Sequence, residues 1–213
     1  MSRVFDPLLV TVLLLNLFAL GTSRLRAVIG ASAIQGLILG ILSIMVHAEV
    51  TVEVLVMAAI AIGVKAIVIP RLLIKAMRDV AIVRDVEPLI GLIPSLAIGA
   101  LGTVASVIFS QTLPIGEYEG SPMILPACLA TVLTGCTVLV TRRKVITQVV
   151  GYLILENGIF ILGLSLLEAM PFLVEVGVLL DLFVAIFVMG IIINHVSREF
   201  TATDAAELSA LKE

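Results

Sequence analysis

Long apolar runs dominate this chain and decide what it can fold into. Seven runs occupy residues 7–20, 27–46, 50–70, 89–110, 123–141, 145–167 and 172–194. Each approaches the roughly 20 residues that a helix needs to cross about 30 Å of hydrocarbon, although the first is somewhat short. The 213 residues are 61% hydrophobic, which leaves too little polar surface for a soluble domain of this size. The sequence therefore predicts an all-α, polytopic membrane protein with about seven transmembrane helices.

Basic residues cluster after alternate runs. Eleven of the 13 follow odd-numbered runs, and these are Arg24, Arg26, Arg71, Lys75, Arg78, Arg84, Arg142, Arg143, Lys144, Arg198 and Lys212. The segments after even-numbered runs carry none. Because Lys and Arg are retained on the cytoplasmic side of a membrane, this alternation predicts an N-terminus outside and a C-terminus in the cytoplasm. A wrong count would scramble the alternation, so it also supports seven spans.

The domain organisation expected from these runs is simple. Residues 1–196 form a single transmembrane helical domain, and residues 197–213 form a cytoplasmic tail. An offset of 122 residues matches Gln35, Gly36, Ser43 and Glu53 with Asn157, Gly158, Ser165 and Glu175. We interpret residues 1–70 and 123–196 as candidates for parallel three-helix repeats, with 71–122 as a linker plus the fourth span. Chance matching between leucine-rich segments is the alternative.

Five ionisable residues interrupt the apolar runs, and these are Glu53, Lys65, Glu156, Glu175 and Asp181. A charge at mid-membrane costs about 2.5–3.5 kcal/mol on insertion scales, so it usually faces a partner or a wet cavity and marks an ion path. We predict Glu156 and Asp181 as protonatable centres of a proton relay, with Lys65 as counter-ion or relay. Two alternatives stay open: both acids could serve structural pairing alone, and the long stem of Lys65 could carry its ammonium to the interface.

Four further residues are secondary candidates for the same relay. Glu53 and Glu175 begin their spans on the predicted outer side, where the helix dipole favours a carboxylate. For this pair a structural role is the first interpretation, and proton entry or exit is the alternative. Tyr152 lies four residues before Glu156 on the same helical face, where its hydroxyl could reach the carboxylate. Asn157 directly follows Glu156.

Cofactor motifs are missing from the sequence. His47 and His195, the only two histidines, fall at opposite faces of the predicted bundle and so could not together ligate one haem. There is no CxxC pair, no carboxylate–histidine metal spacing and no nucleotide-binding fingerprint. We therefore expect no cofactor, no metal site, no nucleic-acid partner and no catalytic turnover in this chain itself.

A recognisable pattern runs over nearly the full chain and is densest in the last three spans. It includes Gly-Tyr-Leu-Ile-Leu-Glu-Asn-Gly at 151–158, and its other segments are 63–65, 69–70, 142–144, 173–177, 180–181 and 208–212. This pattern closely resembles the hydrogenase-4 component E family. Spans five to seven are also similar to the small three-helix K subunit of respiratory complex I and to its small counterpart in multi-subunit sodium/proton antiporters. Those proteins carry a membrane glutamate in each of two adjacent helices, which correspond here to the helices of Glu156 and Asp181.

The resemblance implies a membrane subunit of a complex I-like, energy-converting assembly. This would be a group 4 nickel–iron hydrogenase or a formate hydrogenlyase in the cell inner membrane, with antiporter-like and other membrane subunits as partners. Redox chemistry would occur in other subunits, and this multi-pass chain would contribute buried carboxylates to proton translocation. Membership of a cation/proton antiporter built from several subunits and a purely structural role as a membrane scaffold remain the alternatives.

Overall fold

The computed structural model describes residues 2–46, 51–79, 89–112, 121–165 and 190. All regular elements in these ranges are helical. They are α1 (Ser2–Gly21), α2 (Leu25–Val46), α3 (Val52–Ile62), the π-helix η1 (Gly63–Val68), α4 (Ile69–Asp79), α5 (Leu92–Thr112), α6 (Ile124–Thr141) and α7 (Val145–Ser165).

Six candidate membrane spans lie in this part of the chain, by length and composition. They are Val4–Gly21, Leu25–Val46, Val54–Arg78, Leu92–Thr112, Ile124–Thr141 and Ile146–Leu164. These spans correspond to the first six predicted runs, and α3, η1 and α4 together make the third. The predicted seventh span at 172–194 lies outside the described residues.

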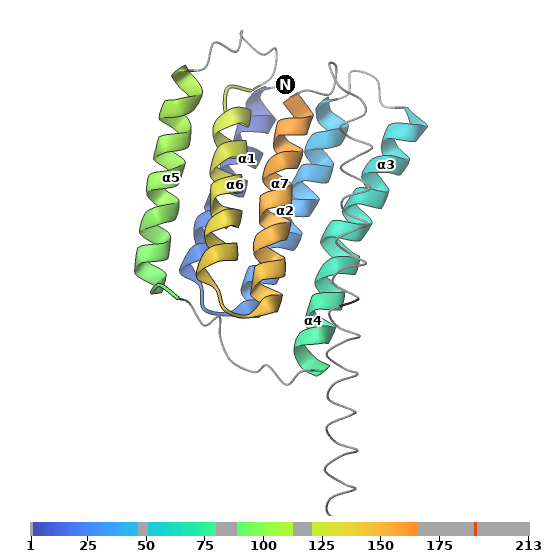
Figure 1. Cartoon of the computed structure of the whole chain (residues 1–213). Coiled ribbons are helices and arrows are strands. Elements are labelled where there is room, and N and C mark those ends of the chain that lie inside the picture. Colours follow the sequence, from blue (N-terminus) through green and yellow to red (C-terminus); the bar gives the residue numbers. More distant parts are fainter. Residues whose placement is uncertain (1, 47–50, 80–88, 113–120, 166–189, 191–213) are drawn as a thin grey trace, which may run out of the picture.

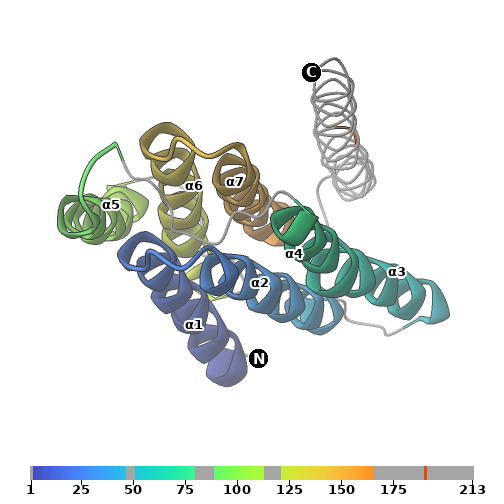
Figure 2. The same cartoon turned by 90° about the horizontal axis from the view of Figure 1, so that it is seen from below.

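The helices run side by side with alternating direction (Figure 1). Helices α1, α2, α7 and α6 form a ring in which each contacts the next. Helix α5 packs on α1 and α6, whereas α3, η1 and α4 pack on α2, so the two additions lie on opposite sides of the ring (Figure 2). The α1–α2 and α6–α7 turns meet at one end, which we call the basic end because it carries Arg24, Arg26, Arg142, Arg143 and Lys144.

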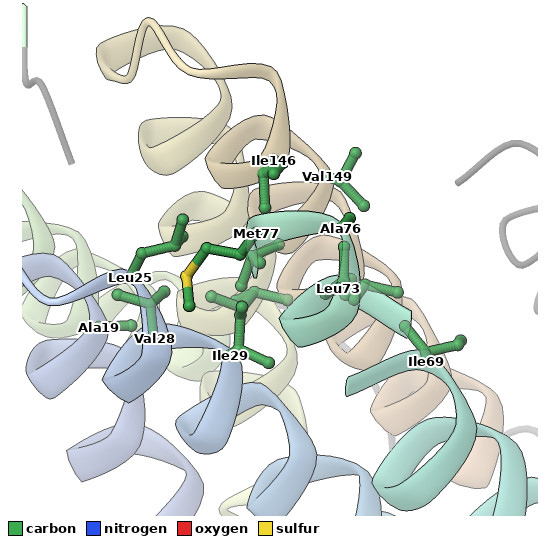
Figure 3. Packing of buried hydrophobic residues seen from close by; sticks show 13 residues of the cluster. Ala19, Leu25, Val28, Ile29, Ile69, Leu73, Ala76, Met77, Ile146 and Val149 are labelled. Carbon is green, nitrogen blue, oxygen red and sulfur yellow. The ribbon is translucent and has the colours of Figure 1, made fainter. Parts of the chain in front are cut away.

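Buried side chains divide the bundle into three levels. The basic-end cluster contains Ala19, Leu25, Val28, Ile29, Ile69, Leu73, Ala76, Met77, Ile146, Val149, Val150, Leu153 and Ile154 (Figure 3). The far-end cluster contains Phe5, Leu9, Val12, Leu13, Ile38, Leu39, Leu42, Ile124, Ala127, Cys128, Ala130, Ile161 and Leu164. Between them lies a polar layer of buried side chains, comprising Asn16, Gln35, Lys65, Thr131, Glu156 and Asn157.

The order of residues along each helix explains this layering. On α1 the far-end cluster reaches Leu13 and the basic-end cluster begins at Ala19, so Asn16 lies between them. On α7 the polar pair 156–157 separates Ile154 from Ile161 in the same way. A charged or amide side chain buried in an apolar run needs a polar partner on a neighbouring helix, because lipid offers none. The polar residues therefore gather at one depth.

Several hydroxyl side chains elsewhere in the described spans bond within their own helices. Five of these hydroxyl groups donate to the backbone carbonyl four residues earlier in the same helix. The bonds run from Thr11 to Pro7, Thr103 to Gly99, Ser106 to Gly102, Thr137 to Leu133 and Thr141 to Thr137. This local bond satisfies the hydroxyl without a second helix. The long apolar runs can thus contain Ser and Thr without forming a channel.

The third span continues past its predicted end at Pro70. Proline has no N–H to donate, and its ring crowds the carbonyl four residues earlier. Here the preceding turn is a π-helix, in which the N–H of Ile69 donates to the carbonyl of Val64. The wider turn relieves the crowding, and α4 then runs to Asp79. The predicted boundary was therefore too early, because the π turn absorbs the proline.

Glycines allow α6 and α7 to approach backbone to backbone. A Cβ added at Gly135 would lie 2.6 Å from the Cα of Leu155 and even closer to its amide nitrogen. A Cβ added at Gly158 would lie 2.7 Å from the backbone nitrogen of Val132. Small residues at helix contacts bring backbones together in membranes, where packing drives association. This close contact fixes α7, which carries the buried acid.

Because α6 and α7 approach so closely, a single methyl group added at their contact should lower the stability of the protein. Gly135→Ala should lower the free energy of unfolding by about 1–3 kcal/mol, because the backbone of Leu155 cannot move aside as a flexible side chain could. Unfolding of the purified protein in mixed micelles, followed by circular dichroism, measures this loss. Gly30→Ala is the control, since a Cβ there meets nothing within 4 Å. Equal stability of both variants would contradict the packing described.

Candidate functional site

The centre of the polar layer is an ion pair between η1 and α7. Lys65 Nζ lies 3.1 Å from Glu156 Oε1, and the two side chains are only 8% and 4% exposed. Phe160, one turn beyond Glu156, places its ring centroid 5.0 Å from the same ammonium. One face of α7 thus presents a carboxylate and an aromatic ring to the lysine, and both stabilise a buried cation.

The path of the third span explains how a lysine reaches this depth. Lys65 lies within η1, where the π turn changes the direction in which side chains leave the helix. On α2, Gly36 faces this turn, and a Cβ added there would lie 2.8 Å from the Cβ of Lys65. Gly40, one turn further on, admits the side chain of Ile62 in the same manner. The glycines let α2 and η1 approach closely enough to direct the lysine stem toward α7.

A row of hydrogen bonds extends from α7 across the ring. Asn157 Nδ2 donates to Gln35 Oε1 at 3.4 Å, and Gln35 Nε2 donates to Asn16 Oδ1 at 2.8 Å. Asn16 Nδ2 donates to Thr131 Oγ1 at 2.8 Å, and Thr131 donates to the carbonyl of Ala127 at 2.6 Å. We call this the amide row. It links α7, α2, α1 and α6 at the depth of the ion pair.

The structure treats the predicted site residues differently. It brings Lys65 and Glu156 together and joins Asn157 to Gln35. Tyr152 is half-buried and packs against the basic-end cluster. Glu53 lies in the first turn of α3, after the cap in which Thr51 accepts a bond from the N–H of Val54, and its side chain lies outside the described part. Both Glu175 and Asp181 lie outside the described residues.

Two members of the amide row were missed in the sequence. Asn16 and Thr131 sit in apolar runs and carry no charge, so ionisable residues alone do not point to them. A signal was present: Asn16 and Gln35 are lone amides within the first two spans. A buried amide in a membrane helix seeks a partner on another helix, and this would have connected them.

Arg142, one of the basic residues on the predicted cytoplasmic side, is buried at the basic end and only 1% exposed. Its Nη2 donates to the carbonyl of Leu20 at 3.0 Å, in the last turn of α1. Gln148 Nε2 donates to the Arg142 carbonyl at 3.1 Å. Burial lowers the pKa of this guanidinium below its usual value. Arg142 therefore fastens the α6–α7 turn to the negative end of the α1 dipole.

The side chains that commonly bind metals are scattered in the described part of the chain. No set of three or more His, Cys, Asp or Glu side chains converges among those residues. Cys128 is buried, Cys136 is exposed, and both are free thiols. Within the described residues, the site therefore offers one carboxylate beside one ammonium, both buried between helices.

Several curated proteins are similar to this chain over most of its length. An uncharacterized protein of Mycobacterium tuberculosis is 31% identical over 193 residues, which cover 89% of this chain and 87% of that protein. Hydrogenase-4 component E of Escherichia coli K12 is 26% identical over 215 residues, covering 99% of this chain and 98% of its own length. Hydrogenase-4 component E of Shigella flexneri gives the same figures. No family model matches the chain, and no solved structure matches it.

Burial of the ion pair predicts strong coupling between its two partners. Lys65→Met and Glu156→Gln should each lower the free energy of unfolding by about 3–5 kcal/mol, because each leaves a buried charge without its counter-charge. The double variant should lie near the wild type, since a buried pair replaced as a whole is often neutral. Denaturant unfolding of the four proteins in micelles gives the coupling energy. Additive losses would show that the two side chains do not interact.

Proposed function

Because the chain belongs to the hydrogenase-4 component E family, we propose that it is a membrane subunit of an energy-converting hydrogenase. In this proposal the redox chemistry belongs to other subunits, and this chain takes part in the proton translocation coupled to it. The chain itself has no catalytic turnover and holds no cofactor. Its partners are the antiporter-like and other membrane subunits of the assembly, within the cell inner membrane.

The observation that carries the proposal is the Lys65–Glu156 pair inside two candidate membrane spans. A buried pair contributes little net stability, because the cost of removing two charges from water offsets their attraction. A membrane protein would reach the same stability more easily with apolar side chains. Ionisable groups held at such depth are therefore typical of ion pathways. The same argument disfavours a purely structural scaffold.

The pair supplies a simple electrostatic switch. At 3.1 Å and an effective dielectric constant of about 20, the two charges attract by about 5 kcal/mol. A proton that arrives on Glu156 removes this attraction, while the ring of Phe160 stays beside the ammonium of Lys65. Loss of the proton restores the pair. Protonation of Glu156 thereby changes the net charge of the pair from zero to +1 and leaves the ammonium on η1 without its counter-charge, a change that a neighbouring protein of the assembly can sense.

The remaining predicted residues enter the proposal as further steps. Asp181, in the seventh span that the sequence predicts, is a second protonatable centre in this proposal. Tyr152, one turn before Glu156, connects the acid toward the basic end. Glu53, in the first turn of α3, and Glu175, near the start of the predicted seventh span, are the proposed entry or exit positions. We place the basic end in the cytoplasm and the N-terminus outside, because cytoplasmic loops retain Lys and Arg.

The proposal is tested in the intact complex by counting protons translocated per catalytic turnover. Glu156→Gln should reduce this ratio strongly while the redox subunits continue to turn over, because glutamine cannot exchange a proton. The double variant Lys65→Met with Glu156→Gln should show the same loss in an assembly of near-normal stability. Complex reconstituted in vesicles with a pH-sensitive dye gives the rate of proton translocation and the rate of redox turnover in one preparation.

Thr137→Val is the matched control, since Thr137 lies in a candidate span and its hydroxyl bonds to its own helix. A scaffold role would leave the double variant with a normal ratio, which would refute the proposed role in proton translocation. Nickel and iron should co-purify with the wild-type complex. An assembly without these metals, whose proton transport depends on sodium, would instead identify a cation/proton antiporter.

A further inference from the structure

Two neighbouring residues of α2 contact the two helices that form the ion pair. Gln35 accepts the hydrogen bond of Asn157, which adjoins Glu156 on α7. Gly36 leaves room for the Cβ of Lys65 on η1. A single turn of α2 therefore lies against the carboxylate-bearing helix on one side and the lysine-bearing turn on the other. Any rotation of α2 would change both contacts together.

The amide row has only one self-consistent direction. The carbonyl of Ala127 can only accept, so the hydroxyl of Thr131 donates to it and must accept from Asn16. The amide oxygen of Asn16 then faces Gln35 and accepts its N–H, and the oxygen of Gln35 accepts from Asn157. Hydrogen bonds aligned head to tail polarise and strengthen one another. The orientation of Asn157 is therefore set from the opposite side of the bundle.

The rotation of α7 follows from the orientation of Asn157. Successive residues of an α-helix project about 100° apart, since 3.6 residues make one turn. When Asn157 points to Gln35, the side chain of Glu156 projects to the neighbouring sector, where η1 packs on α2. Amide side chains do not titrate, so the row keeps this geometry whether or not Glu156 carries a proton.

We infer that Gln35 and Asn157 are positioning residues, which hold the carboxylate of Glu156 opposite Lys65 during proton exchange. The inference rests on the proposed function and extends it from the ion pair to the neutral row behind it. The amides carry no proton themselves. Their role is to return the pair to one geometry after each cycle of protonation.

Interchanging the long amide side chain of Gln35 and the short one of Asn157 tests this inference. Gln35→Asn shortens one partner by a methylene and should lower the protons translocated per turnover, while redox turnover continues. Adding Asn157→Gln restores the combined reach between α2 and α7 and should raise the ratio again, although the bond to Asn16 stays weakened. Net loss of each buried hydrogen bond shifts an equilibrium by up to about tenfold, so the paired geometry should fall by roughly tenfold in the single variant, in which both bonds of Gln35 are affected. Gln35→Leu, which can make no such bond, should show the larger effect.

The outcomes separate this inference from the proposed function. A merely structural role for Gln35 would lower complex yield and both activities together, with an unchanged ratio of protons to turnover, and would overturn the inference. If Glu156→Gln lowers the ratio of protons to turnover but Gln35→Asn and Gln35→Leu leave it normal, the positioning inference is also overturned. The proposed function then stays intact. A normal ratio in Glu156→Gln would refute the proposed function itself. Thr137→Val again provides the control for assembly.

Discussion

The ion pair of Lys65 and Glu156 governs much of the arrangement around it, because hydrocarbon offers neither charge a partner. Once both residues lie within membrane spans, the two helices that carry them must meet at one depth. That requirement explains why glycines stand where α2 approaches η1 and where α6 approaches α7. It also explains the division of the core, in which an apolar cluster on each side of the polar layer separates the pair from both ends of the bundle.

The same constraint connects features that are far apart in the sequence. The π turn before Pro70 accommodates the proline and also carries the lysine. The amide row ties four helices together at the level where charges must be aligned, and Arg142 fixes the turn between α6 and α7 to the end of α1. Each device limits rotation or sliding of a helix. A carboxylate that exchanges a proton, the role proposed for Glu156, needs such restraint, because its charge changes while the positions of its neighbours must not.

Sequence reasoning could predict the class of fold and the importance of two side chains, but not their pairing. Apolar runs near the length of a membrane span predict the six described candidate spans, and the depth of Glu156 and Lys65 within their runs singles them out as candidates. The family resemblance is confirmed by the curated relatives. Pairing depends on which helices neighbour each other and on a π turn, and neither has a local pattern. Asn16 and Thr131 are hydrogen-bonded to each other, and a contact across 115 residues of sequence has no local pattern that predicts it.

The most direct test is the distance between the lysine ammonium and the glutamate carboxyl in a lipid bilayer. Solid-state NMR of protein labelled with nitrogen-15 at lysine Nζ and carbon-13 at the glutamate carboxyl measures it, with Glu156→Gln assigning the signal. The account predicts a dipolar contact that corresponds to an ion pair within about 4 Å. A lysine ammonium that shows no coupling to Glu156 and exchanges freely with water at the membrane surface would contradict it.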